Sequence, residues 1–126
     1  MQKTIDGLAV LAGLMGACGV AAAAAAAHMP GGAPLASVAM ILLVHAAALP
    51  SLTARARDAG KTARIWLASA IVLALGATLF SADVALLTLR GARLFPMAAP
   101  TGGVTMIAGW LLVSMAGLAG FSGRYR

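Results

Sequence analysis

The stretch IWLASAIVLALGATLFSADVALLTLR, residues 65–90, decides the fold of this chain. Its first charged residue is Asp83, and Arg90 closes it. An α-helix rises about 1.5 Å per residue, so roughly 20 apolar residues cross the ~30 Å of hydrocarbon in a bilayer. The stretch therefore predicts a transmembrane helix at about residues 65–89.

The composition of the whole chain points to lipid as its solvent. The chain has 126 residues, of which 62% are hydrophobic and only 10% charged, with a mean hydropathy of +0.98. A soluble domain typically carries about a quarter charged residues. Three further apolar segments, at about residues 7–27, 35–52 and 103–121, are also close to membrane-spanning length. We expect an all-α polytopic membrane protein, a single domain over residues 1–126 that forms a bundle of four transmembrane helices.

The first apolar segment also has features of a secretory signal peptide, with a basic start, an apolar middle and small residues. The residues MGAC at 15–18 loosely resemble a lipoprotein processing site. Asp6 is unusual in the basic region of a signal peptide, so we interpret the segment as the first membrane span. Cys18 is the only cysteine and cannot form an intrachain disulfide, so it is interpreted as a small packing residue.

The distribution of Lys and Arg predicts the orientation in the membrane. Seven of them flank one side of the predicted spans: Lys3, Arg55, Arg57, Lys61, Arg64, Arg124 and Arg126. Arg90 and Arg93 flank the other side. The positive-inside rule then places both termini in the cytoplasm, in the inner membrane of a bacterium, and Trp66 and Tyr125 fall at the same interface.

The net charge of +6 and the pI of 11.3 would also suit a nucleic-acid-binding protein. Such proteins carry a basic stripe, often interleaved with aromatic residues, and this chain has one Tyr and two Trp. We therefore expect no nucleic-acid partner.

Small residues recur every four positions in the first segment, at Ala9, Gly13, Ala17, Ala21 and Ala25. A ridge of this kind lets helix backbones approach closely in lipid. It predicts that the first helix is covered, either by its own bundle or by a partner. A GC-rich genome, which favours alanine codons, would give the same pattern. Gly109, Ala116 and Gly120 form a similar series in the last segment.

Two histidines are candidate polar or ligand positions, because ionisable groups inside a membrane are costly and often functional. His45 lies ten residues into the second segment, about 15 Å deep. A neutral packed imidazole is the first interpretation, and a ligand or proton-relay role is the alternative. His28 lies at the end of the first segment, where it closes the helix. No His or Cys pair has the spacing of metal ligands, so no metal or other cofactor is expected.

Asp83 and Arg90 mark the far end of the third segment. Asp83 is eighteen residues beyond Ile65, about 27 Å along the helix, and so near the outer edge of the bilayer. A solvated boundary is the first interpretation. The alternative is a polar cluster of His28, Asp83 and Arg90 at the outer face.

The stretch APTGGVTMIAGW, residues 99–110, contains the predicted start of the last helix. We expect Pro100 to end the preceding connection, Thr101 to cap the helix, and Gly102 and Gly103 to permit a tight entry into the helix.

The segments TLFSADVALLTL, ARLF and APTGGVTMIAGWLL resemble the small four-helix inner-membrane proteins of the YgdD type, a family of unknown function with mitochondrial relatives. The resemblance involves a phenylalanine-serine step, a proline, paired glycines and an alanine-glycine-tryptophan step. It also involves a histidine at the end of the first helix and one in the second. The matching residues here are Phe80, Ser81, Pro100, Gly102, Gly103, Gly109, Trp110, His28 and His45. Ala82 replaces the family's usual glycine, and Asp83 occupies a position expected to be uncharged.

The resemblance implies a fold and a location and brings no activity with it. Scant polar content and small-residue ridges favour an accessory or scaffold subunit that packs against a larger membrane complex, with lipid and other subunits or its own copies as partners. The alternative is a small oligomeric transporter or channel that uses His45 and the polar residues of the outer face. The residues offer no nucleophile or paired acid and base, so no enzymatic activity is expected.

Overall fold

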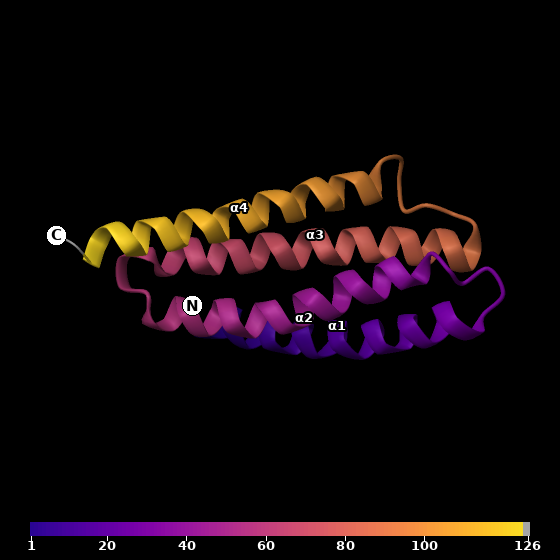
Figure 1. Ribbon diagram of the computed structural model, residues 1–126, viewed down its shortest axis with the longest axis horizontal. Helices are drawn as coiled ribbons and strands as arrows, with labels where there is room; N and C mark the ends of the chain where they lie inside the picture. Colours follow the sequence, from indigo (N-terminus) through magenta and orange to yellow (C-terminus); the bar gives the residue numbers. More distant parts are fainter. Residues whose placement is uncertain (125–126) are drawn as a thin grey trace.

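The computed structural model describes residues 1–124, which form four long α-helices (Figure 1). These are α1 (Gln2–His28), α2 (Leu35–Asp58), α3 (Ala63–Arg90) and α4 (Ala98–Arg124), with a short 3₁₀ turn, η1 (Gly60–Thr62), before α3. All four are long and apolar enough to cross a membrane. The described residues contain no strand, and the predicted all-α polytopic fold is confirmed. The predicted interfacial residues Tyr125 and Arg126 lie outside the described residues.

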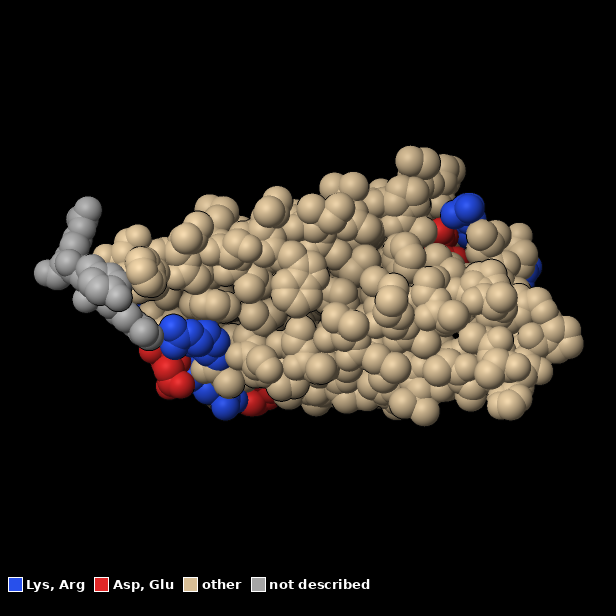
Figure 2. All heavy atoms as spheres, in the orientation of Figure 1, with Lys and Arg blue, Asp and Glu red and all other residues tan. Residues whose placement is uncertain are grey.

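Each helix packs chiefly against its neighbour in the sequence, so that α2 and α3 are central and α1 and α4 flank them. The N-terminus, the α2–α3 turn and the end of α4 lie at one end of the bundle, and the other two connections lie at the opposite end (Figure 1). In Figure 2, Lys, Arg and Asp gather at the two ends and the surface between them is uncharged. The molecule therefore has the charge pattern of a membrane-spanning body.

All four helices extend beyond their predicted bounds, most of all α1 and α4 at their starts and α2 at its end. The predicted second helix stopped at Leu52, but α2 continues through Pro50 to Asp58. Pro50 lacks a backbone N–H and so removes one hydrogen bond from the helix. Beside it, the Thr53 hydroxyl donates to the carbonyls of Leu49 and Pro50 at 3.0 Å each. Helix α2 therefore carries the arginines of its last turn out of the apolar region.

The predicted fourth helix began at residue 103, whereas α4 begins at Ala98. Pro100 is therefore in the first turn of the helix, where a missing N–H costs no intrahelical bond. The expected Thr101 cap is wrong, because the Thr101 hydroxyl donates to the carbonyl oxygen of Met97 at 2.8 Å.

Helices α3 and α4 touch through their backbones. A Cβ atom at Gly102 would lie 2.6 Å from the backbone nitrogen of Phe80 and 2.8 Å from the carbonyl oxygen of Gly76. A Cβ atom at Gly76 would in turn lie 2.8 Å from the carbonyl oxygen of Gly102. About two turns further along α4, a Cβ atom at Gly109 would meet the Leu73 side chain at 2.7 Å. Glycine at these positions therefore sets the distance between the two helices.

The predicted ridge of α1 is not the face that packs within the bundle. Helix α1 buries Ile5, Leu8, Ala12, Met15 and Gly19 instead. Of the ridge residues, Gly13, Ala17 and Ala21 are exposed, and a Cβ atom at Gly13 would meet nothing within 4 Å. The larger side chains of the neighbouring face are the ones buried in the bundle. Of the ridge, Ala25 packs against the core, and the bundle leaves Gly13, Ala17 and Ala21 uncovered.

A methyl group at Gly102 tests the contact between α3 and α4. We expect Gly102→Ala to lower the free energy of unfolding by about 1–3 kcal/mol, because two backbones must move apart. The matched control is Gly103→Ala, since a Cβ atom at Gly103 would meet nothing within 4 Å and alanine favours a helix. Thermal unfolding in detergent, followed by circular dichroism, measures both. Equal stability of the two variants would contradict the close approach.

Candidate functional site

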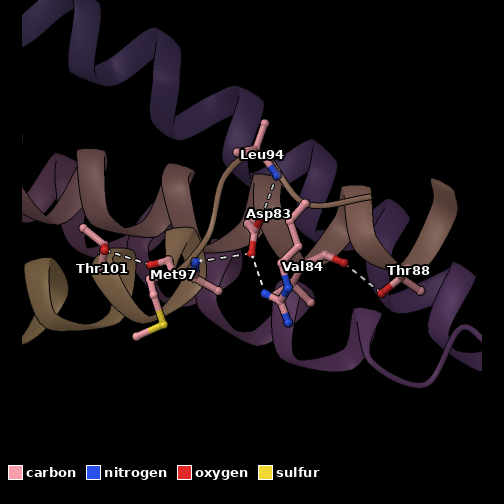
Figure 3. A network of polar contacts seen from close by, with 8 residues as sticks. Asp83, Val84, Thr88, Leu94, Met97 and Thr101 are labelled. Carbon is pink, nitrogen blue, oxygen red and sulfur yellow. Dashed lines mark hydrogen bonds and ion pairs between the residues drawn. The ribbon is translucent and has the colours of Figure 1, made fainter. Parts of the chain in front are cut away.

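The most polar site in the described chain surrounds Asp83, on the last third of α3 (Figure 3). Its side chain is 0% exposed. The Arg93 guanidinium donates from Nη1 to Asp83 Oδ2 at 3.1 Å, which is also an ion pair. The backbone N–H of Leu94 donates to Oδ1 at 2.8 Å, and that of Ala99 donates to Oδ2 at 3.3 Å. Both carboxylate oxygens are therefore occupied.

These contacts fold the α3–α4 connection back over the end of α3. Arg93 and Leu94 belong to that connection, and Ala99 is in the first turn of α4. The first N–H groups of a helix have no partner within it and carry a partial positive charge, which favours a nearby carboxylate. Asp83 therefore caps α4 from a different helix.

The structure corrects both interpretations of Asp83. The carboxylate is not at a solvated boundary, because it is fully buried under the connection. The alternative cluster is also wrong in its members. Among the described residues, neither His28 nor Arg90 donates to Asp83; Arg93 does. His28 and Arg90 are exposed at the ends of α1 and α3. Arg93 and the backbone N–H groups of Leu94 and Ala99 were not predicted as partners of Asp83, because the connection was expected to run on to residue 103.

His45 is buried in the middle of α2, with 2% of its surface exposed. Its Nδ1 atom lies 2.7 Å from the carbonyl oxygen of Ile41, so Nδ1 donates and Nε2 is an acceptor. Nε2 is buried and has no hydrogen-bond partner among the described residues. The ring centroid lies 5.8 Å from that of Trp110 on α4, tilted by 55°. His45 thus links α2 to α4 by a ring contact and keeps one unused acceptor.

Of the other motif residues, Phe80 lies at the contact between α3 and α4, whereas Ser81 lines the space between α1 and α3. Phe80 is half-buried against Gly102, and Ser81 is buried with a hydroxyl that has no partner in the described chain. Gly103 is half-buried without a close contact. These positions serve helix packing. Gly76, the partner of Gly102 in the contact between α3 and α4, could not be predicted, because in the sequence it is only a lone glycine in an apolar run.

The polar groups do not converge on one centre. In residues 1–124 no three His, Cys, Asp or Glu side chains lie close enough together to hold a metal ion. The imidazole of His45 bonds to its own helix, and the carboxylate of Asp83 bonds to the α3–α4 connection. The arrangement can position helices and can accept one further hydrogen bond at His45 Nε2.

Comparison with known proteins identifies a family. The model of a protein family of unknown function, DUF423, matches residues 15–103, from the middle of α1 to the second turn of α4. No curated protein and no solved structure matches the chain. The match agrees with the resemblance to small membrane proteins noted above.

Substitution of Asp83 tests the cap. We expect Asp83→Asn to lower the free energy of unfolding by about 1–3 kcal/mol, because the ion pair is lost and an amide N–H₂ faces backbone donors. Asp58→Asn is the matched control, since Asp58 is exposed at the end of α2. Thermal unfolding in detergent gives the difference. An unchanged midpoint for Asp83→Asn would show that the cap contributes nothing.

Proposed function

Because the chain belongs to the DUF423 family of proteins of unknown function, we propose its role from its geometry. It is a multi-pass protein of the bacterial inner membrane, without catalytic activity, that packs as an accessory or scaffold subunit against a larger membrane complex.

The exposed small-residue face of α1 carries this proposal. Gly13, Ala17 and Ala21 line that face and have no cover within the bundle. Apolar side chains gain little by leaving lipid for protein, so helices associate in membranes through close packing, which small residues permit. A second helix could approach α1 along this face more closely than along the exposed face of α4, where Val104, Ile107 and Leu111 project. This face is the best place for a partner subunit.

The polar sites support a non-enzymatic role. A general acid or base must reach a substrate and be free to exchange a proton. Asp83 is buried with both oxygens bonded. His45 is buried too, and its imidazole ring lies beside the ring of Trp110. Neither residue has a neighbouring group that would make it a catalytic pair.

The charge distribution supports an orientation with both termini in the cytoplasm. The N-terminus and the α2–α3 turn share one end of the bundle (Figure 1), and the turn is rich in Lys and Arg. At this end the Arg55 guanidinium lies 5.6 Å from the centre of the Trp66 ring, a cation–π contact at the level expected for an interface. At the opposite end one of the two arginines is neutralised by Asp83.

A transporter or channel remains the second candidate, favoured by one observation. Nε2 of His45 is a buried acceptor with no partner in the described residues, about 15 Å along α2 from Leu35. An unused polar atom at this depth is what a proton or ion path would need. Asp83, the other ionisable group of the buried interior, is already paired.

Accessibility of single cysteines tests the orientation. In a Cys18→Ser background, we expect Ala92→Cys to react with a membrane-impermeant maleimide in intact cells. Lys61→Cys should react only after the cells are broken, because the basic turn is cytoplasmic. Both positions are exposed in connections between helices, so they are matched. The reverse pattern would overturn the orientation.

A bulky residue on the open face of α1 tests the scaffold role. We expect Ala17→Phe to lower the amount of partner subunit that co-purifies in mild detergent by about tenfold or more, the effect of one well-packed contact. The variant should keep its fold, because Ala17 is exposed. Val104→Phe, on the exposed face of α4, is the control and should retain the partner.

Two results would contradict the scaffold proposal. One is a wild-type protein that is monomeric and without a partner in native membranes. The other is ion or proton flux in liposomes that is abolished by His45→Ala, which would establish the transporter instead.

A further inference from the structure

A groove of about 560 Å³ runs between α1 and α3, with α2 as its floor. Its volume is in the range of sites that hold small molecules. It exists because the facing side chains of α1 and α3 are small and leave the space between the helices unfilled. The small residues of its two walls are Cys18, Ala21, Ala22 and Ala25 on α1, and Thr78, Ser81, Ala82 and Ala85 on α3.

The groove is at least one leaflet long. Its α3 wall runs from Thr78 to Leu89, eleven residue steps or about 16 Å, and its α1 wall runs from Leu11 to Met29, eighteen steps or about 27 Å. Half of the bilayer hydrocarbon is about 15 Å thick. The α1 wall ends at Met29 and the α3 wall at Leu89, so the groove opens at the end of the bundle that carries the α1–α2 and α3–α4 connections. It therefore reaches from the membrane surface towards the bilayer centre.

The groove is too narrow for a helix. A volume of about 560 Å³ spread over about 16–27 Å of length gives a mean cross-section of about 21–35 Å². A helix with its side chains is about 10–12 Å wide and needs roughly twice that area or more, so it cannot enter the groove. A flexible hydrocarbon chain is thin enough, and lipid supplies such chains on every side of the protein. The shape of the groove thus selects a single chain rather than a partner helix.

The charge at the mouth selects the headgroup. Arg90 directly follows Leu89 at the end of the α3 wall and is exposed. The one acidic group at this end, Asp83, is buried and paired with Arg93. Arg90 consequently has no acidic partner among the described residues and leaves this end of the groove positive. Basic residues beside a gap between transmembrane helices are a known setting for anionic lipid headgroups.

We propose that the groove binds one acyl chain of an anionic phospholipid whose phosphate lies beside Arg90. The binding site borders the open face of α1 and shares Ala21 with it, whereas Gly13 and Ala17 do not line the groove. The proposal does not depend on the scaffold role or on the orientation of the protein in the membrane, because only the end of the bundle that holds Arg90 matters.

Native mass spectrometry of the purified protein tests the acyl-chain site. The protein is incubated in detergent with equal amounts of phosphatidylglycerol and phosphatidylcholine that have the same acyl chains. We expect one phosphatidylglycerol to be retained per wild-type chain. Ala82→Phe should reduce retention about tenfold, because the ring fills the groove from an exposed wall position. Ile107→Phe, which adds the same ring to the exposed face of α4, should leave it unchanged.

Arg90→Gln tests the headgroup. We expect the preference for phosphatidylglycerol over phosphatidylcholine to fall about fivefold, the effect of one basic residue near an anionic lipid, while the total lipid retained stays the same. Equal retention of the two lipids by the wild type would overturn the anionic headgroup. Full retention by Ala82→Phe would overturn the groove. If Ala82→Phe does not fold, Ala21→Phe on the opposite wall makes the same test.

Discussion

The close approach of α3 and α4 is the contact on which the rest of the structure depends. In lipid, burial of apolar side chains between helices gains little, so helices hold together by contact area and by polar bonds. Gly76 and Gly102 supply the contact area, because the absence of side chains brings the two backbones together. The carboxylate of Asp83 supplies the polar bonds, because it holds the α3–α4 connection at 2.8 Å through the N–H of Leu94 and also reaches the first turn of α4. Both devices act at the same end of the helix pair, so α4 is positioned although it contacts little else.

A buried aspartate is costly in a membrane unless its charge is compensated. Here the compensation comes from three donors, two of them backbone N–H groups that would otherwise lack partners at a helix start or in a connection. The third donor, Arg93, is half exposed and keeps part of its own hydration. A single carboxylate thus satisfies groups that would each cost free energy if left unpaired. Asp83 is therefore explained by structure, and no catalytic role is required for it.

The sequence predicted the helices better than the contacts between them. Length and hydropathy are properties of each segment by itself, so the all-α polytopic fold followed from them. The start of α4 was misplaced because Pro100 and the paired glycines read as a connection, whereas a proline in a first turn and Gly102 in a helix contact are both compatible with helix. Arg93 was missed as the partner of Asp83 because the pairing depends on a connection that folds back. The sequence left open whether the bundle or a partner covers the ridge of α1, because small residues occur all round that helix and periodicity alone could not select the buried side.

The two halves of the molecule differ in how completely they are packed. The α3–α4 pair has backbone contact and a capped connection. The pocket on its side is lined by residues 93–97 and Pro100, so it belongs to the connection and the start of α4 rather than to the space between the two helices. The α1–α2 half is held by larger side chains, and the small residues of α1 are left beside open space on two sides, Gly13 and Ala17 towards the exterior and Ala22 and Ala25 towards the groove. Small side chains that are not packed within the bundle leave space for another molecule. A helix of a partner fits the open face of α1, whereas only a hydrocarbon chain fits the groove. Binding by this protein should therefore be sought on α1, with α3 and α4 as the rigid part that presents it.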